Sequence, residues 1–219
     1  MGHLYILPSH QHLPYIPLRI DHKEIDFSDF NYRVPDKKGG VYSIKDRSKL
    51  LMYLRDIIEP YSLAIQLDFQ LTARVAEIKG LEWEDVDFEN NRIYIHRQAL
   101  NERCMNDDLS FGNTEINVYN RTKCNTEKGK RYLPLTQEAR EILKKAKEIN
   151  PDGQYVFMPF GKLMLTDTFN EYLKKYCNAA GVPYYSSHKI RFSSCSLLYD
   201  GKTLHKYQHL WAIQILLQR

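Results

Sequence analysis

The chain has 219 residues, of which 43% are hydrophobic and 26% charged, and its net charge is +4. This length suits one domain with a sizeable core plus an arm or a small partial domain, and the composition is ordinary for a soluble globular protein. The mild positive charge is compatible with a polyanionic partner but does not require one. No apolar run reaches the roughly 20 residues of a transmembrane helix, and the first residues do not resemble a signal peptide. We therefore expect a protein without a membrane partner.

Cysteine and histidine usage predicts neither a disulfide framework nor a metal centre. The four cysteines show no C-x-x-C spacing, which favours a reduced, cytoplasmic location. His10 and His12 have no third ligand near them in the sequence. We expect no metal and no cofactor.

The amino-terminal half predicts an arm followed by helices. Residues 1–42 are rich in Pro, His and Tyr and show no sustained period, so they are interpreted as an arm or the remnant of a longer segment. Ser43 suits a helix N-cap, and apolar residues follow it at helical spacing as far as Ile58. Two further helix patterns cover residues 61–70 and 71–81, the second ending at Gly80.

The rest of the chain predicts a small sheet and then more helices. An acidic turn at 83–87 precedes an alternating strand at 92–97, and strands at 116–123 and 131–135 are expected to form a hairpin. Helices are expected at 136–149, 166–180 and 187–199, with a short extended segment at 155–157. This order predicts an α+β fold, mostly helical with a small antiparallel sheet.

Arg74 is the first candidate for binding a phosphate. It opens a short helix, where a guanidinium can present a planar fork to an anion, although a plain surface arginine is the alternative. Glu77 follows one turn later, where it could orient Arg74 or could pair with a neighbouring base.

Basic residues surround the predicted hairpin tip. Lys123 lies near a strand end, from which its ammonium group could protonate a leaving oxygen. Lys128, Lys130 and Arg131 flank the same tip and are predicted DNA contacts. Lys123 could equally be a plain phosphate contact of the same kind.

His188 and Arg191 lie one turn apart at a helix N-terminus, which favours a bound anion. His188 could act as an acid or base near neutral pH, or it could be a structural histidine. The acidic residues of the 82–87 turn could suggest metal ligands, but we interpret them as a solvated turn anchored by its apolar neighbours.

Four motifs in order carry a family resemblance: LTARVAEIKGLEWEDVDF (71–88), IYIH (93–96), RTKCNTEKGKRYLPL (121–135) and SHKIR (187–191). Together they resemble the catalytic domain of the tyrosine site-specific recombinases, the phage integrase family. The resemblance covers roughly residues 43–201. It implies the fold of the DNA breaking-rejoining enzymes and double-stranded DNA as the partner.

The resemblance also implies a role for each candidate residue. Arg74 and Arg191 would clamp the scissile phosphate and stabilise its transition state. Lys123 would be the general acid on the 5′ oxygen, and His188 would assist proton transfer. The reaction would be metal-free DNA cleavage and rejoining through a 3′-phosphotyrosyl bond, in the integration of a mobile element.

The tail departs from the family pattern. In the family a Gly-His pair follows the second arginine by about 22 residues and a tyrosine nucleophile by about nine more. Here that position is Ile213, and Tyr207 is the one late candidate nucleophile, 16 residues after Arg191. An amphipathic terminal helix is one interpretation of this tail. A one- or two-base slip near Lys202 is the other, because synonymous codons for 203–219 can encode a family-like peptide in another frame.

We therefore expect three regions: an arm or DNA-clamping remnant at 1–42, an incomplete catalytic domain at 43–201, and an atypical tail at 202–219, for which a frameshift is one of the two interpretations. Such a chain would be truncated at both ends. Three hypotheses follow from it. The chain is a degenerate recombinase that cannot cleave alone; it is active through Tyr207 or a tyrosine donated by an intact recombinase protomer; or it is a DNA-binding module that modulates an intact relative.

Overall fold

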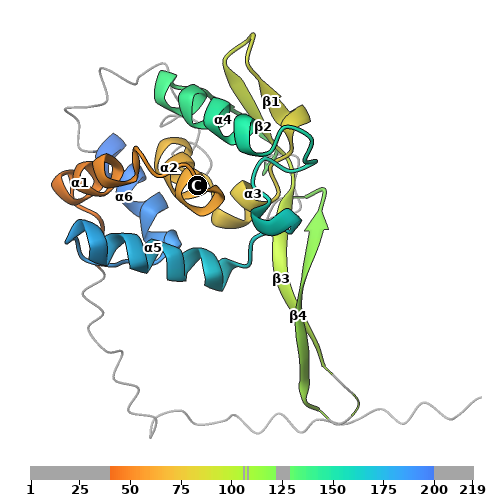
Figure 1. The fold of residues 1–219 in the computed structure, drawn as a ribbon. Helices are drawn as coiled ribbons and strands as arrows, with labels where there is room; N and C mark the ends of the chain where they lie inside the picture. The colour runs from red at the N-terminus through yellow and green to blue at the C-terminus, as the bar shows by residue number, and fades with distance from the viewer. Residues whose placement is uncertain (1–39, 106, 108, 122–128, 200–219) are drawn as a thin grey trace, which may run out of the picture. The chain divides into compact units, whose positions relative to one another are not determined.

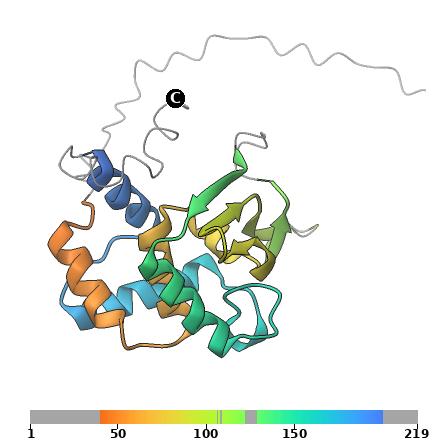
Figure 2. The same ribbon diagram turned by 90° about the horizontal axis from the view of Figure 1, so that it is seen from above.

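The computed structural model describes residues 40–105, 107, 109–121 and 129–199. The chain divides into two units, residues 1–38 and 39–219, and everything described lies in the second. Figures 1 and 2 both show the helices gathered beside the strands, which form two small antiparallel sheets. The predicted α+β class is confirmed. Within the described part of the chain, no helix has the length and apolar character needed to span a membrane.

Helix α2 lies at the centre of the helical part. Its bounds are Pro60–Leu71, and almost every one of its side chains is buried. It packs against the other large helices and against the short helix that follows it, which are α1 (Ile44–Leu54), α3 (Val75–Lys79), α4 (Gln137–Ile149), α5 (Thr166–Ala180) and α6 (Ser187–Tyr199). A helix buried on all sides needs partners on all sides, and these helices provide them.

The predicted helix ends are largely confirmed. Ser43 Oγ accepts the amide of Asp46, and Thr136 Oγ1 accepts the amide of Ala139. Gly181 closes α5 with a positive φ of 61°. The first helix ends at Leu54 rather than near Ile58, because Pro60 opens α2 and restricts the backbone just before it.

The strand pairing differs from the prediction. Strands β1 (Val86–Asp87), β2 (Arg92–Ile95) and β5 (Arg131–Pro134) form one sheet in the order β1-β2-β5. Strands β3 (Gln98–Met105) and β4 (Phe111–Tyr119) form a separate two-stranded ribbon. The predicted hairpin between 116–123 and 131–135 is therefore wrong, since β4 pairs with β3 and β5 pairs with β2.

The base of this ribbon is fixed to the helices through Lys79 of α3. Its buried Nζ donates to Asn101 Oδ1 at 2.6 Å and to Thr166 Oγ1 at 3.0 Å. Burial lowers the pKa of Lys79 to about 8, although the nearby charge of Asp167 opposes this shift. The far end of the ribbon extends away from the helices (Figure 1).

Tyr42 joins the start of the described chain to α6. Its backbone amide donates to Ser193 Oγ at 2.8 Å, and its hydroxyl donates to the carbonyl of Tyr185 at 2.5 Å. The ring is 2% exposed and meets Phe69 edge to face. These contacts hold α6 against α2, where the candidate site lies.

Thr72 ends α2 in the left-handed region, with φ 53° and ψ 23°. A β-branched side chain is strained there, whereas glycine is not. We expect Thr72→Gly to raise the free energy of unfolding by about 1 kcal/mol in urea denaturation. Thr72→Ala, which keeps a Cβ in the same conformation, serves as the control. A glycine variant less stable than the alanine variant would contradict the explanation.

Candidate functional site

Arg74 and Glu77 form the predicted pair at the start of α3. The Arg74 amide donates to Glu77 Oε2 at 2.9 Å, and Arg74 Nη1 donates to Oε1 at 2.9 Å. The Glu77 side chain is fully buried, whereas that of Arg74 is 36% exposed. Glu77 thus fixes the guanidinium of Arg74 while leaving part of it open to solvent.

Arg131, at the start of β5, holds the same carboxylate from the other side. Its Nη2 donates to Glu77 Oε2 at 2.7 Å, and its Nη1 donates to Oε1 at 3.2 Å. Burial alone would raise the pKa of Glu77, but the hydrogen bonds and charges of Arg131 and then Arg74 hold it below its ordinary value. Glu77 therefore orients Arg74 and also pairs with a neighbouring base.

Arg191 approaches this cluster from α6. Asp68, which is completely buried in α2, interacts electrostatically with both Glu77 and Arg191. Two buried carboxylates therefore lie beside the arginines: Glu77 is held between Arg74 and Arg131, and Asp68 lies within electrostatic reach of Arg191. The sequence reasoning missed Asp68, although an acidic residue within the apolar 61–70 helix pattern was an available signal.

His188 lies one turn before Arg191 and is exposed. Its ring meets Phe192 edge to face, with the ring centroids 4.8 Å apart. His188 thus lies at the surface, one helical turn before the half-buried Arg191, and the catalytic roles of both stay predictions.

Three of the predicted site residues, Lys123, Lys128 and Tyr207, lie outside the described residues. Lys130 directly precedes β5 and is half-buried. The DNA contacts predicted for Lys130 and Arg131 stay predictions, and Arg131 has the additional structural role described above.

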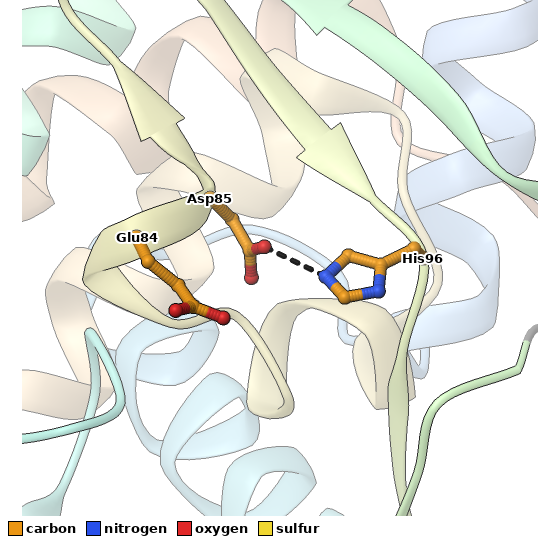
Figure 3. A group of neighbouring side chains, drawn as sticks. All are labelled: Glu84, Asp85 and His96. Atoms are coloured by element: carbon orange, nitrogen blue, oxygen red, sulfur yellow. Dashed lines mark hydrogen bonds and ion pairs between the residues drawn. The ribbon is translucent and has the colours of Figure 1, made fainter.

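The acidic turn is solvated only in part, since Glu84 is exposed whereas Glu82 and Asp85 are buried. The side chains of Glu82 and Asp85 are 12% and 4% exposed, and both form ion pairs with Arg97, which is also buried. Asp85 Oδ1 lies 2.8 Å from His96 Nε2, as Figure 3 shows, and Arg97 Nη2 lies 2.7 Å from Glu84 Oε1. The sequence interpretation was wrong for Glu82 and Asp85, because the cation that compensates these two acids lies beyond the turn, after β2.

This cluster also explains why the acidic residues do not require a metal. Glu84, Asp85 and His96 place one potential ligand atom each within 4.8 Å of one another. Burial raises the pKa of Asp85, and the hydrogen bond from His96 opposes that rise. Arg97 already supplies a positive charge to these carboxylates, so the cluster is an internal ion-pair network.

Comparison with known proteins identifies the family. The model of the phage integrase family matches residues 43–211. The transposase from transposon Tn916 of Enterococcus faecalis is 27% identical over 139 residues, covering 56% of this chain and 31% of the relative. The Tn1545 transposase of Streptococcus pneumoniae matches with the same values. The chain thus spans about a third of the length of these curated relatives.

Solved structures share the fold. The integrase of transposon Tn1549, in complex with circular intermediate DNA, has a TM-score of 0.57 at 18% identity, covering 73% of this chain and 54% of that one. The XerA recombinase has a TM-score of 0.54 at 16% identity, covering 74% of this chain and 50% of its own. Because the family model matches most of this sequence, the chain belongs to the phage integrase family.

Proposed function

We propose that this chain is a DNA integration and site-specific recombination protein of a mobile element, and that it holds one backbone phosphate between Arg74 and Arg191. The observation that carries the proposal is the pair of buried carboxylates, Glu77 and Asp68, around which the arginines gather. A guanidinium fixed by a buried partner is already oriented for a phosphate oxygen. The relatives named as transposases and a DNA-bound integrase support a role on DNA.

The proposed chemistry follows from the residue types. The two arginines would neutralise charge that develops on the phosphate during strand cleavage, which is typically worth ~10²–10³ in rate for one such donor. Lys123 would protonate the leaving 5′ oxygen, and His188 would assist the proton transfer. None of these steps needs a metal or a cofactor, and the protein would act in the cytoplasm.

We propose further that residues 43–219 taken by themselves do not cleave DNA. Residues 202–219 contain no Gly-His pair, and their one tyrosine, Tyr207, stands at about half the family spacing from Arg191. Without an aligned nucleophile the covalent step fails, whatever the arginines bind. An intact recombinase protomer would then be the partner that supplies a tyrosine.

Two measurements test this function. Arg74→Ala should weaken binding to a labelled 30-base-pair duplex about tenfold, whereas Lys174→Ala, an exposed charge on α5, should have little effect. Equal effects of the two variants would contradict phosphate binding by Arg74.

A nicked suicide duplex should give no covalent adduct with this chain alone. An adduct lost in Tyr207→Phe would instead assign the nucleophile to Tyr207.

A further inference from the structure

Asp68 is a buried carboxylate that the proposed chemistry does not use. It is 0% exposed in the middle of α2, and among the described residues no hydrogen bond reaches either of its carboxylate oxygens. Burying a carboxylate without hydrogen bonds is costly, so a neutral side chain of the same size would suit the core better. Its retention points to a task beyond packing.

The packing of α6 on α2 brings Arg191 within electrostatic reach of Asp68. Ser194 Oγ donates to the carbonyl of Phe69, the residue after Asp68, at 3.4 Å. Arg191 precedes Ser194 by three residues, so the two share one face of α6. Nη1 of Arg191 is buried, although the residue as a whole is only half-buried. The Nη1 end of the guanidinium thus lies in the core, while other parts of the residue are open to solvent.

We propose that Asp68 is a positioning residue for Arg191, fixing the inner edge of its guanidinium so that the outer edge can meet the DNA phosphate. This inference rests on the proposed function, because it concerns the orientation of an arginine in that same site. Glu77 orients Arg74 through two hydrogen bonds. Asp68 would orient Arg191 through its negative charge and its buried position.

The charges of the cluster support this assignment. Burial and the neighbouring Glu77 hold the pKa of Asp68 well above its ordinary value, and Arg191 is the group that lowers it. Arg191 therefore helps Asp68 to keep its charge.

Thermal unfolding tests the contact without DNA. Arg191→Met leaves Asp68 without its compensating charge and should lower Tm by roughly 10 °C. Adding Asp68→Asn to that variant should restore most of the loss, while Asp68→Asn alone should leave Tm unchanged or raised. If the Tm changes of the two single variants simply add in the double variant, the two side chains are not coupled and the inference fails. Should Arg191→Met not fold, Arg191→Gln, which also removes the positive charge, takes its place in the cycle.

The positioning role can be tested by whether Asp68→Asn strengthens or weakens DNA binding. Removing a negative charge should by simple electrostatics strengthen binding to the 30-base-pair duplex, as expected for Asp87→Asn on the exposed β1 turn. If Asp68 positions Arg191, Asp68→Asn should instead weaken binding about threefold, and it should have no further effect in Arg191→Met. Unchanged or tighter binding by Asp68→Asn would overturn the inference.

The outcomes separate this inference from the proposed function. If Arg191→Met weakens binding but Asp68→Asn does not, the positioning role fails and phosphate binding stands. If Arg191→Met binds DNA as the unaltered chain does, phosphate binding by Arg191 fails. If the thermal unfolding of the single and double variants then still shows that Asp68 and Arg191 are coupled, Asp68 is only a structural partner of Arg191. That outcome also overturns the inference.

Discussion

Replacing Glu77 with glutamine is expected to lower the free energy of unfolding by about 3 kcal/mol. The carboxylate is fully buried between Arg74 and Arg131, and all four of its close contacts are charge-assisted. Glutamine keeps the volume but leaves two guanidinium groups, one of them largely buried, without their negative partner. Breaking a buried ion pair from one side typically costs about 3–5 kcal/mol, and the partial exposure of Arg74 favours the lower end.

Urea denaturation at several pH values checks this expectation. Because the folded-state pKa of Glu77 lies below its ordinary value of 4.5, its stabilising contribution is fully present above pH 4.5 and is lost as the pH falls through the folded-state pKa. The stability difference between the unaltered chain and Glu77→Gln should therefore shrink in acid. Glu148→Gln, at an exposed position on α4, should cost little at any pH. A constant difference across the pH range would show that lost packing, not charge, causes the effect.

The same substitution should affect DNA binding. Among the residues that the structure describes, Glu77 is the side chain that holds Arg74, so Glu77→Gln should also weaken binding to the 30-base-pair duplex, by several-fold. Plain electrostatics would predict tighter binding, because a negative charge has been removed. The sign of the change thus distinguishes orientation of Arg74 from simple charge.

Local spacing explains why much of the fold could be predicted. The caps at Ser43 and Thr136 and the Arg74–Glu77 pair each involve residues three positions apart, so the sequence contains the whole interaction. The order of the large helices followed from the same local patterns, whereas strand β3 was not predicted. The family resemblance then supplied roles that no single motif could justify.

The pairing of the strands could not be predicted from the same signals. Strand β3 contains polar residues on both faces, since much of the ribbon is open to solvent on both sides, and it shows no period of two. The nearest alternating segments, 116–123 and 131–135, were therefore joined to each other. Their true partners, β3 and β2, are set by tertiary packing.

The buried ion pairs could not be predicted from the sequence for a related reason. Arg131 lies 54 residues from Glu77 in the sequence, and Asp68 meets Arg191 only because α2 and α6 pack together. Acidic residues in a turn are usually solvated, which is why Glu82 and Asp85 were misinterpreted. Burial of a charge depends on a partner, and here the partner comes from a distant part of the chain.

Replacement of Arg97 is the second substitution that we expect to have a large effect on stability. Its side chain is 7% exposed and forms ion pairs with Glu82, Glu84 and Asp85, two of which are themselves buried. Replacing Arg97 with methionine leaves Glu82 and Asp85 close together in the interior without a cation. We expect the free energy of unfolding to fall by about 3–4 kcal/mol, since repulsion between the acids adds to their desolvation.

An exposed arginine supplies the matched control. Arg92 binds Asp87 at 2.9 Å, but both side chains are substantially exposed, so Arg92→Met should cost less than about 1 kcal/mol. If the loss in Arg97→Met arises from uncompensated charge, the double variant Arg97→Met/Glu82→Gln should recover part of it. Equal losses for Arg92→Met and Arg97→Met, or no recovery in the double variant, would contradict the view that Arg97 is the internal counter-ion of the acidic turn. Because Arg97 directly precedes β3, its loss should also loosen the ribbon, which hydrogen exchange of the β3 amides can measure.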